Sequence, residues 1–204
     1  MVKHFVNLVG WKAVYSVCRQ RDCVYIDSLT MWLAVRLFCG KGYARHPGSS
    51  ASAVLTKDGS KLVLAAREFA PKGPCERILA VPFPLVDYDG FVETVAGEVS
   101  EGEDVIIGIS SPKQNILASR ISMVVSSSTI YCIGAVVDDY YSDRLIPGWV
   151  RRFRVEWLYR GVVSPKRMIA KLSATISAFY KLMISGDERT KFAQFILNHS
   201  PRQG

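Results

Sequence analysis

One apolar run limits the choice of folds more than any other feature of the sequence. Residues 104–109, DVIIGI, are mostly β-branched and follow acidic residues, a pattern typical of a central parallel strand that is buried on both faces. Other short apolar runs recur along the chain, and segments with helical spacing separate them. The sequence therefore predicts an α/β fold with a Rossmann-like parallel sheet and helices on both of its faces.

The same patterns predict the individual elements. Strands are expected at residues 4–8, 23–26, 61–66, 77–82, 104–109 and 129–133. Helices are expected at residues 11–19 and 28–39. A third is expected to follow a turn at residues 88–90 and to continue as far as residue 99. A fourth is expected to begin with Ser111 as its N-cap and Pro112 at its first helical position. Residues 134–145 are expected to form a loop, and the remainder is expected to be helical, with a last helix at 188–197.

The charge of the chain is concentrated at its C-terminal end. Residues 144–204 contain twelve Lys and Arg against three Asp and Glu, a net +9, whereas the preceding residues sum to about −1. We expect an α/β catalytic core at residues 1–145 and a basic helical appendage at residues 146–204. Such an appendage favours a phosphate-bearing partner: a nucleotide, a nucleic acid or an anionic membrane surface.

Cysteine, histidine and hydropathy patterns set further expectations. The five cysteines have no paired metal-binding spacing, and the three histidines are scattered, so we expect reduced thiols and no metal site. No signal peptide is evident at the start of the sequence, and no uninterrupted apolar run reaches about 18 residues. These patterns predict a soluble or peripheral protein.

Aromatic and cationic residues alternate in residues 147–167, PGWVRRFRVEWLYRGVVSPKR. The spacing predicts one helix that ends near Gly161 and a second that begins at Ser164, with Pro165 at its first position. Arg160 would then end the first helix and Arg167 would lie in the first turn of the second. Both side chains could reach one anion, although an amphipathic helix pair with solvated arginines fits the same pattern.

Several candidate functional residues follow predicted strands, where α/β proteins bind ligands. Asp27 could act as a general base or simply as a helix N-cap. Arg45 lies in a loop with Pro47 and Gly48, where it could clamp a phosphate or remain on the surface. Gln114, beside Lys113 at a helix start, lies where backbone N–H groups attract anions.

A pair of acidic residues follows the last predicted strand. Asp138 and Asp139 could bind a divalent ion, but a pair of acids in a loop is also typical of a turn and cap.

Four motifs in the same order resemble the WecG/TagA/CpsF family of glycosyltransferases, and the resemblance spans most of the chain. The clearest is PGW, VEWLYR and SPKR within residues 147–167, and GISSPKQN at residues 108–115 resembles the family's G-x-PKQE. Upstream, Asp27 and Ser28, followed by RLFCGKGY and ARHPGS, resemble a strand-ending DG and an arginine-containing loop. GAVVD at residues 134–138 resembles the family's GGAFD.

The resemblance implies an inverting, metal-independent enzyme without a cofactor. It would move an N-acetylmannosamine-type sugar from a UDP-sugar donor to a polyprenyl-diphosphate-linked acceptor. By correspondence with the family's motifs, Asp27 would be the base, Arg45, Gln114, Arg160 and Arg167 would bind the donor and its diphosphate, and Asn7 would approach the acceptor. The enzyme would be cytoplasmic and peripheral on the inner membrane face, against anionic lipid, and could form a homo-oligomer.

The chain departs from the family's motifs at several positions. Ser28 stands where the family has Gly, Asn115 where it has Glu, and Ala170 where it has a third arginine. Two alternatives therefore stay open: a degenerate member without catalytic activity, and a basic nucleic-acid-binding α/β module, for which interleaved aromatic residues could stack on bases. Given the resemblance, nucleic acid is not the expected partner.

Overall fold

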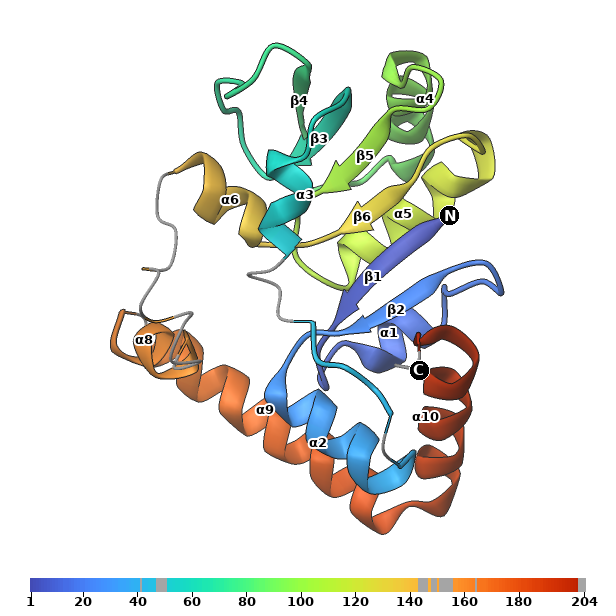
Figure 1. The fold of residues 1–204 in the computed structure, drawn as a ribbon, viewed down its shortest axis with the longest axis vertical. Helices are drawn as coiled ribbons and strands as arrows, with labels where there is room; N and C mark the ends of the chain where they lie inside the picture. Colours follow the sequence, from blue (N-terminus) through green and yellow to red (C-terminus); the bar gives the residue numbers. More distant parts are fainter. Residues whose placement is uncertain are drawn as a thin grey trace.

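The computed structural model describes residues 1–40, 42–46, 51–142, 147, 150, 156–163 and 165–201. Its centre is a six-stranded sheet in which every neighbouring pair of strands is parallel, in the order β2-β1-β6-β5-β3-β4 (Figure 1). The α/β, Rossmann-like fold predicted from the sequence is confirmed. The strands are β1 (Val2–Val6), β2 (Cys23–Ile26), β3 (Lys61–Ala65), β4 (Glu76–Ala80), β5 (Asp104–Ile107) and β6 (Ile130–Cys132).

Strand side chains point alternately to the two faces of the sheet, and both faces are buried. In β5, Val105 and Ile107 join one hydrophobic cluster, whereas Ile106 joins another on the opposite face. All three side chains are completely buried. This burial on both faces is why the central strands consist of continuous apolar runs rather than alternating polar and apolar residues.

Helices cover both faces of the sheet. One face is covered near β5 and β3 by α4 (Tyr88–Glu98) and α5 (Lys113–Val124), and near β1 and β2 by α1 (Trp11–Tyr15) and α10 (Gly186–His199). The opposite face packs against α3 (Ser52–Thr56) and α6 (Val136–Tyr141). The other helices in the described part of the chain are α2 (Leu29–Phe38), α8 (Glu156–Val163) and α9 (Pro165–Ile184).

The C-terminal helices contribute to the core beside the N-terminal strands. Phe192 and Phe195 of α10 are almost completely buried, and the rings of Phe192 and Trp11 lie 5.3 Å apart, edge to face. Leu182, near the end of α9, joins the same cluster. On the surface, Lys12 Nζ and Glu188 Oε1 form an ion pair at 2.6 Å. The helices at the end of the chain therefore complete the hydrophobic cluster around β1 and β2.

Several sequence predictions of local structure were wrong. Residues 88–90 form the first turn of α4, which Asp87 caps, and not a turn before it. The predicted loop at 134–145 contains α6, and α8 continues past Gly161 to Val163. Helix α3 was not predicted, and Ser111 does not cap α5, because its hydroxyl donates to Asn115 Oδ1 instead.

Part of the predicted helix pair lies outside the described residues. In the first predicted helix, Trp149 and residues 151–155 are not described. Ser164, the predicted N-cap of the second helix, is not described either. Within the described part of the chain, no helix combines the length and the apolar character needed to span a bilayer.

Candidate active site

The candidate site begins where three neighbouring strands end. Asn7, Asp27 and Ile133-Gly134 follow β1, β2 and β6, which lie side by side in the sheet. The pairing of Val6 with Ile26 makes Asn7 and Asp27 neighbours, and Asp27 N donates to Val6 O at 2.9 Å. Carboxyl ends of parallel strands meet at one edge of a sheet, which is the usual place for a ligand in this architecture.

Asp27 is held at this edge without serving as a helix cap. The cap of α2 is the next residue, Ser28, whose Oγ accepts a hydrogen bond from Met31 N at 3.2 Å. The interpretation of Asp27 as an N-cap is therefore wrong. Ser28, one of the departures from the family's motif, has a local role in starting α2. Asp27 itself is half-buried, so the residue is partly accessible to solvent at the edge of the sheet.

Arg45 lies directly beside Asp27. A short extended segment returns along β2, where Arg45 forms a parallel bridge with Ile26 and His46 N donates to Ile26 O at 2.7 Å. The Nε group of Arg45 donates to the backbone oxygen of Asp27 at 3.4 Å. The structure thus brings the guanidinium of Arg45 to the backbone of Asp27, which lies 18 residues earlier in the sequence. The predicted loop partners Pro47 and Gly48 lie outside the described residues.

Gln114 approaches the same edge from the first turn of α5. Its side chain is 95% buried, yet its Oε1 atom has no hydrogen-bond partner among the described residues. A buried amide oxygen without a partner costs on the order of 1–3 kcal/mol, so such an atom needs a partner such as water, an ion or a ligand. This oxygen is available to accept a hydrogen bond from a ligand.

Gly134 lies beside the side chain of Gln114. It was not predicted as a site residue from the sequence. Its φ is +59°, in the left-handed region that favours glycine. A Cβ at this position would lie 3.6 Å from Gln114 Oε1. The only signal in the sequence was the position of this glycine at the start of the GAVVD motif.

The loops after β1 and β5 also touch. Asn7 Oδ1 accepts hydrogen bonds from Val9 N and Gly10 N, both at 3.0 Å. A Cβ on Gly10 would lie 3.3 Å from Ser111 Oγ, so glycine permits this close approach. The oxygen of Asn7 therefore holds its own loop, and its Nδ2 group is the part of the amide that can donate to a ligand. Gly10 and Ser111 were not predicted as site residues.

Asp138 lies in α6 rather than in a loop, on the opposite side of the sheet from α5. Its Oδ1 atom is 3.9 Å from Arg67 Nε, and Arg67 Nη2 donates to Ser142 Oγ at 2.7 Å. Arg67 follows β3 at the carboxyl edge and was not singled out from the sequence. The structure therefore pairs Asp138 with a cation of the protein, an arrangement that leaves this carboxylate less suited to bind a metal ion.

The two predicted arginines of the appendage are placed only by their helices. Arg160 lies in α8 and Arg167 in the first turn of α9, and these helices contact each other. The side chains of both residues lie outside the described part of the structure. Figure 1 shows α8 and α6 on the side of the molecule toward which the strand arrows point.

Comparison with known proteins identifies a family model that matches part of the chain. Residues 98–191 match the model of the glycosyl transferase WecG/TagA/CpsF family. Gln114, Arg160 and Arg167 lie within the matched segment, whereas Asn7, Asp27 and Arg45 precede it. Among curated proteins and among solved structures, none matches the chain. The match runs from the end of α4 to the first half of α10, and it contains three of the four motifs that resemble the glycosyl transferase WecG/TagA/CpsF family.

Proposed function

We propose that this protein is an inverting glycosyltransferase that moves a sugar of the N-acetylmannosamine type from a UDP-sugar to a polyprenyl-diphosphate-linked acceptor. Two observations support the proposal: the family match over residues 98–191, and the meeting of Asn7, Asp27, Arg45 and Gln114 at the carboxyl edge of β2, β1 and β6. The second carries the most weight, because Arg45 contacts the backbone of Asp27 at the edge where such sheets bind nucleotides.

In this mechanism Asp27 is the general base. Its carboxylate takes the proton of the acceptor hydroxyl while the hydroxyl oxygen bonds to the anomeric carbon of the donor sugar. The bond from that carbon to the UDP oxygen breaks on the opposite face, so the configuration inverts and UDP leaves as an anion. Asp27 then returns its proton to water.

Negative charge builds on the leaving diphosphate, and cationic side chains can stabilise it. Arg45 lies beside Asp27, and we assign Arg160 and Arg167 to the same diphosphate from α8 and α9. A planar guanidinium can donate two parallel hydrogen bonds to phosphate oxygens. Three of them would supply the charge stabilisation that a divalent metal ion supplies in other enzymes, so no metal is required for transfer.

Two amides orient the substrates in this proposal. The buried Oε1 atom of Gln114 accepts a hydrogen bond from a hydroxyl or N-acetyl N–H group of the donor sugar. Asn7, at the end of the neighbouring strand, donates from Nδ2 toward the acceptor. Asn7 is adjacent to Asp27 across the strand pair, so the acceptor would lie between a donor group and the base.

A lipid-linked acceptor requires the enzyme to reach a membrane surface. The net charge of +9 in residues 144–204 favours anionic lipid, and exposed apolar residues on α9 offer a surface to insert at the headgroup level. We therefore propose peripheral binding on the inner face of the cytoplasmic membrane. Self-association of the protein stays a prediction.

The decisive experiment combines nucleotide binding with transfer. UDP and UDP-sugars should raise the melting temperature with a chelator present, and Asp27→Asn should lower the transfer rate by about 10²–10⁴-fold while it preserves the UDP-induced shift. Asp58→Asn is the matched control, because Asp58 is an exposed aspartate before β3, at the opposite edge of the sheet. It should leave both transfer and nucleotide binding unchanged.

Other results would lead to different conclusions. Normal turnover by Asp27→Asn would remove this residue from the role of base. A UDP-induced shift without transfer would indicate a non-catalytic family member. Binding of DNA or RNA that falls steeply with salt and is not displaced by UDP would favour a nucleic-acid-binding module.

A further inference from the structure

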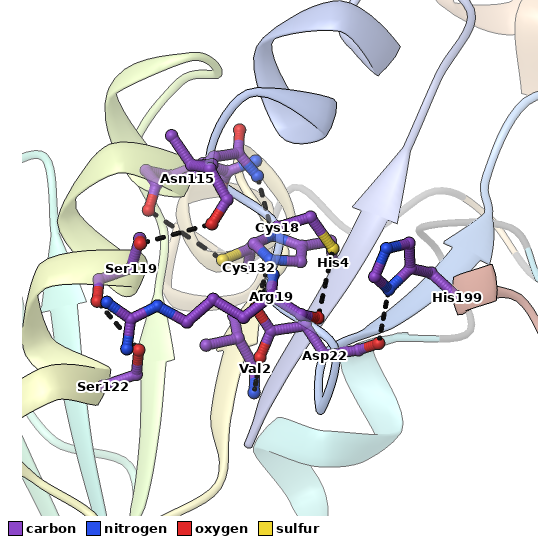
Figure 2. Close-up of polar contacts among 12 residues, drawn as sticks. Val2, His4, Cys18, Arg19, Asp22, Asn115, Ser119, Ser122, Cys132 and His199 are labelled. Atoms are coloured by element: carbon purple, nitrogen blue, oxygen red, sulfur yellow. Dashed lines mark hydrogen bonds and ion pairs between the residues drawn. The ribbon is translucent and has the colours of Figure 1, made fainter. Parts of the chain in front are cut away.

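A second polar cluster lies outside the candidate active site, between β1 and the segment that precedes β2. It contains His4 of β1, together with Cys18 and Asp22 of the segment that joins α1 to β2 (Figure 2). One imidazole nitrogen, one sulfur and one carboxylate oxygen of these residues lie within 4.8 Å of one another. We propose that His4, Cys18 and Asp22 bind a zinc ion.

His4 provides the strongest evidence. The residue is completely buried, and in the described structure its Nε2 atom has no hydrogen-bond partner. The Oδ2 atom of Asp22 is 3.9 Å away, which is too far for a hydrogen bond. Zinc bonds to nitrogen and oxygen are about 2.0–2.2 Å long, so tetrahedral ligands lie about 3.4 Å apart. A shift of about half an ångström would bring both atoms to this separation.

The other nitrogen of the ring is already oriented by Asn115. The Nδ1 atom of His4 lies 3.0 Å from the amide of Asn115, and Ser111 Oγ lies 2.8 Å from the other end of that amide. If the amide is rotated by half a turn, its oxygen accepts from Nδ1–H and its nitrogen donates to Ser111. Both orientations satisfy the chain of hydrogen bonds. The rotated one leaves the Nε2 lone pair for a metal, which is the arrangement that metal-bound histidines usually have.

Asp22 is also held in place, by two backbone hydrogen bonds. Its Oδ1 atom accepts from Val2 N at 3.0 Å and its Oδ2 atom from Arg19 N at 2.9 Å. Asp22 therefore offers a carboxylate in a fixed orientation, and its remaining lone pairs can bind a cation.

Cys18 completes the set and is half-buried, so the cluster can be reached from solvent. Zinc binds the thiolate form of cysteine, so binding of the ion would release the thiol proton. The affinity should therefore increase with pH.

The donor set favours zinc over other common divalent ions. Calcium and magnesium prefer oxygen ligands, whereas zinc accepts nitrogen, sulfur and oxygen in a tetrahedral site. Water can take the fourth position. His4 pairs with Val24 on β2, three residues before Asp27, which corresponds to about 10 Å along the strand. The ion would thus be separate from the transferase site and would join β1 to the segment before β2.

Cobalt(II) is a suitable probe, because its bond to a thiolate gives a charge-transfer absorption band. One equivalent of Co²⁺ added to the full chain should produce this band, and excess Zn²⁺ should remove it. Cys18→Ser should abolish the band and weaken Zn²⁺ binding by about tenfold or more. Zn²⁺ should also raise the melting temperature of the unmodified chain but not that of Cys18→Ser.

Two other cysteines provide matched controls. Cys39 is a half-buried thiol whose pKa burial raises to about 11, and it lies at the end of α2 outside the cluster. Cys39→Ser and Cys23→Ser should retain the cobalt band. Because Cys18 is only half-buried, Cys18→Ser should fold, and its melting temperature in chelator measures this directly.

The proposal fails if one equivalent of Co²⁺ gives no thiolate band, or if Cys18→Ser binds Zn²⁺ as tightly as the unmodified chain. A band lost in Cys39→Ser instead of Cys18→Ser would place the metal elsewhere and would also overturn it. The transferase proposal is tested independently, because the UDP-induced thermal shift is measured with a chelator present.

Discussion

At the scale of single residues, Gly134 and Gln114 depend on each other. Gly134 turns the chain after β6 at φ +59°, and its missing side chain leaves space beside the buried Oε1 atom of Gln114. Any other residue would meet strain from this backbone conformation of about 1–2 kcal/mol. Alanine would also add a methyl group 3.6 Å from the oxygen that is proposed to bind the donor.

We predict that Gly134→Ala lowers the free energy of unfolding by about 1–2 kcal/mol and weakens UDP-sugar binding. The matched control is Gly97→Ala. Gly97 is exposed in α4, and a Cβ there meets nothing within 4 Å, so alanine should stabilise the chain by about 0.5–1 kcal/mol. Urea unfolding and nucleotide titration of both variants provide the measurement. Equal stability changes in the two variants would contradict the role given to Gly134.

Single residues also show what sequence reasoning can identify. Asp27 was selected because it follows a predicted strand and Arg45 because it lies in a loop with Pro47 and Gly48, and the structure brings Arg45 to the backbone of Asp27. Asn115 was noted only as a departure from a motif. Its contact with His4 spans 111 residues of sequence. No local pattern indicates such a contact, and the His4 cluster was missed for the same reason.

At the scale of elements, α9 has two different apolar faces. Near its C-terminal end, Ala178, Phe179 and Leu182 pack into the cluster around β1 and β2. A second set of apolar residues is about half to two-thirds exposed and follows spacings of three and four residues, so it forms a continuous stripe. The stripe consists of Ile169, Leu172, Ile176, Tyr180 and Met183.

We predict that this stripe contributes to membrane binding. The double change Leu172→Ser with Ile176→Ser should weaken binding to vesicles that contain anionic lipid by about tenfold, because partial burial of each side chain contributes on the order of 1 kcal/mol. Sedimentation with vesicles measures the change. Val86→Ser is the matched control, since Val86 is 83% exposed on the loop after β4.

Unchanged vesicle binding in the double variant, or an equal loss in Val86→Ser, would exclude α9 as the binding surface. Figure 1 shows β4 and α9 at opposite ends of the molecule, so the two surfaces can be tested independently.

Elements were predicted best where one local pattern determines them. The β5 strand follows directly from its β-branched run, and its observed bounds, Asp104–Ile107, differ from the prediction only at the end. Helix α6 lies within residues 134–145, which were predicted to form a loop that contains Asp138 and Asp139. Packing stabilises this helix. Val137 lies against Gly108, and a Cβ atom on residue 108 would collide with the side chain of Val137. Such contacts between elements leave no local signal in the sequence.

At the scale of the whole molecule, one buried carboxylate links the segments at the amino ends of the strands. Glu103 precedes β5, and its side chain accepts hydrogen bonds from Ser60 Oγ at 2.8 Å and Ser100 N at 2.9 Å and pairs with Arg77 of β4. Burial alone would raise its pKa, but these contacts together lower the pKa of Glu103 below its ordinary value of 4.5.

The direction of this shift predicts how stability depends on pH. Because the pKa is lower in the folded protein, the stabilisation is complete above about pH 4.5 and is lost as the pH falls through the folded-state pKa. Glu103→Gln should lower the free energy of unfolding at neutral pH by about 1.5–3 kcal/mol. The difference from the unmodified chain should shrink in acid. Urea unfolding at several pH values measures both effects.

Glu98 provides the control for this prediction. It also pairs with Arg77, at 3.1 Å, but its side chain is 54% exposed. Glu98→Gln should therefore change stability by less than about 1 kcal/mol. If the two variants had the same pH dependence, Glu103 would not be the group responsible.

The order of the strands in the sheet could not be predicted from the sequence. The apolar runs predicted six strands and the parallel class, and both are confirmed. The order β2-β1-β6-β5-β3-β4 places β1 beside β6, although about 120 residues separate them in the chain. Burial on both faces makes each strand similarly apolar, so composition does not indicate which strands are neighbours.

The packing of α10 against α1 and β1 has a consequence for biosynthesis. A ribosome produces Trp11 long before Phe192, and the two rings contact each other in the finished fold. The apolar surface around the first two strands therefore stays uncovered until α10 has been synthesised. During that interval, chaperones can bind the exposed apolar surface of the nascent chain.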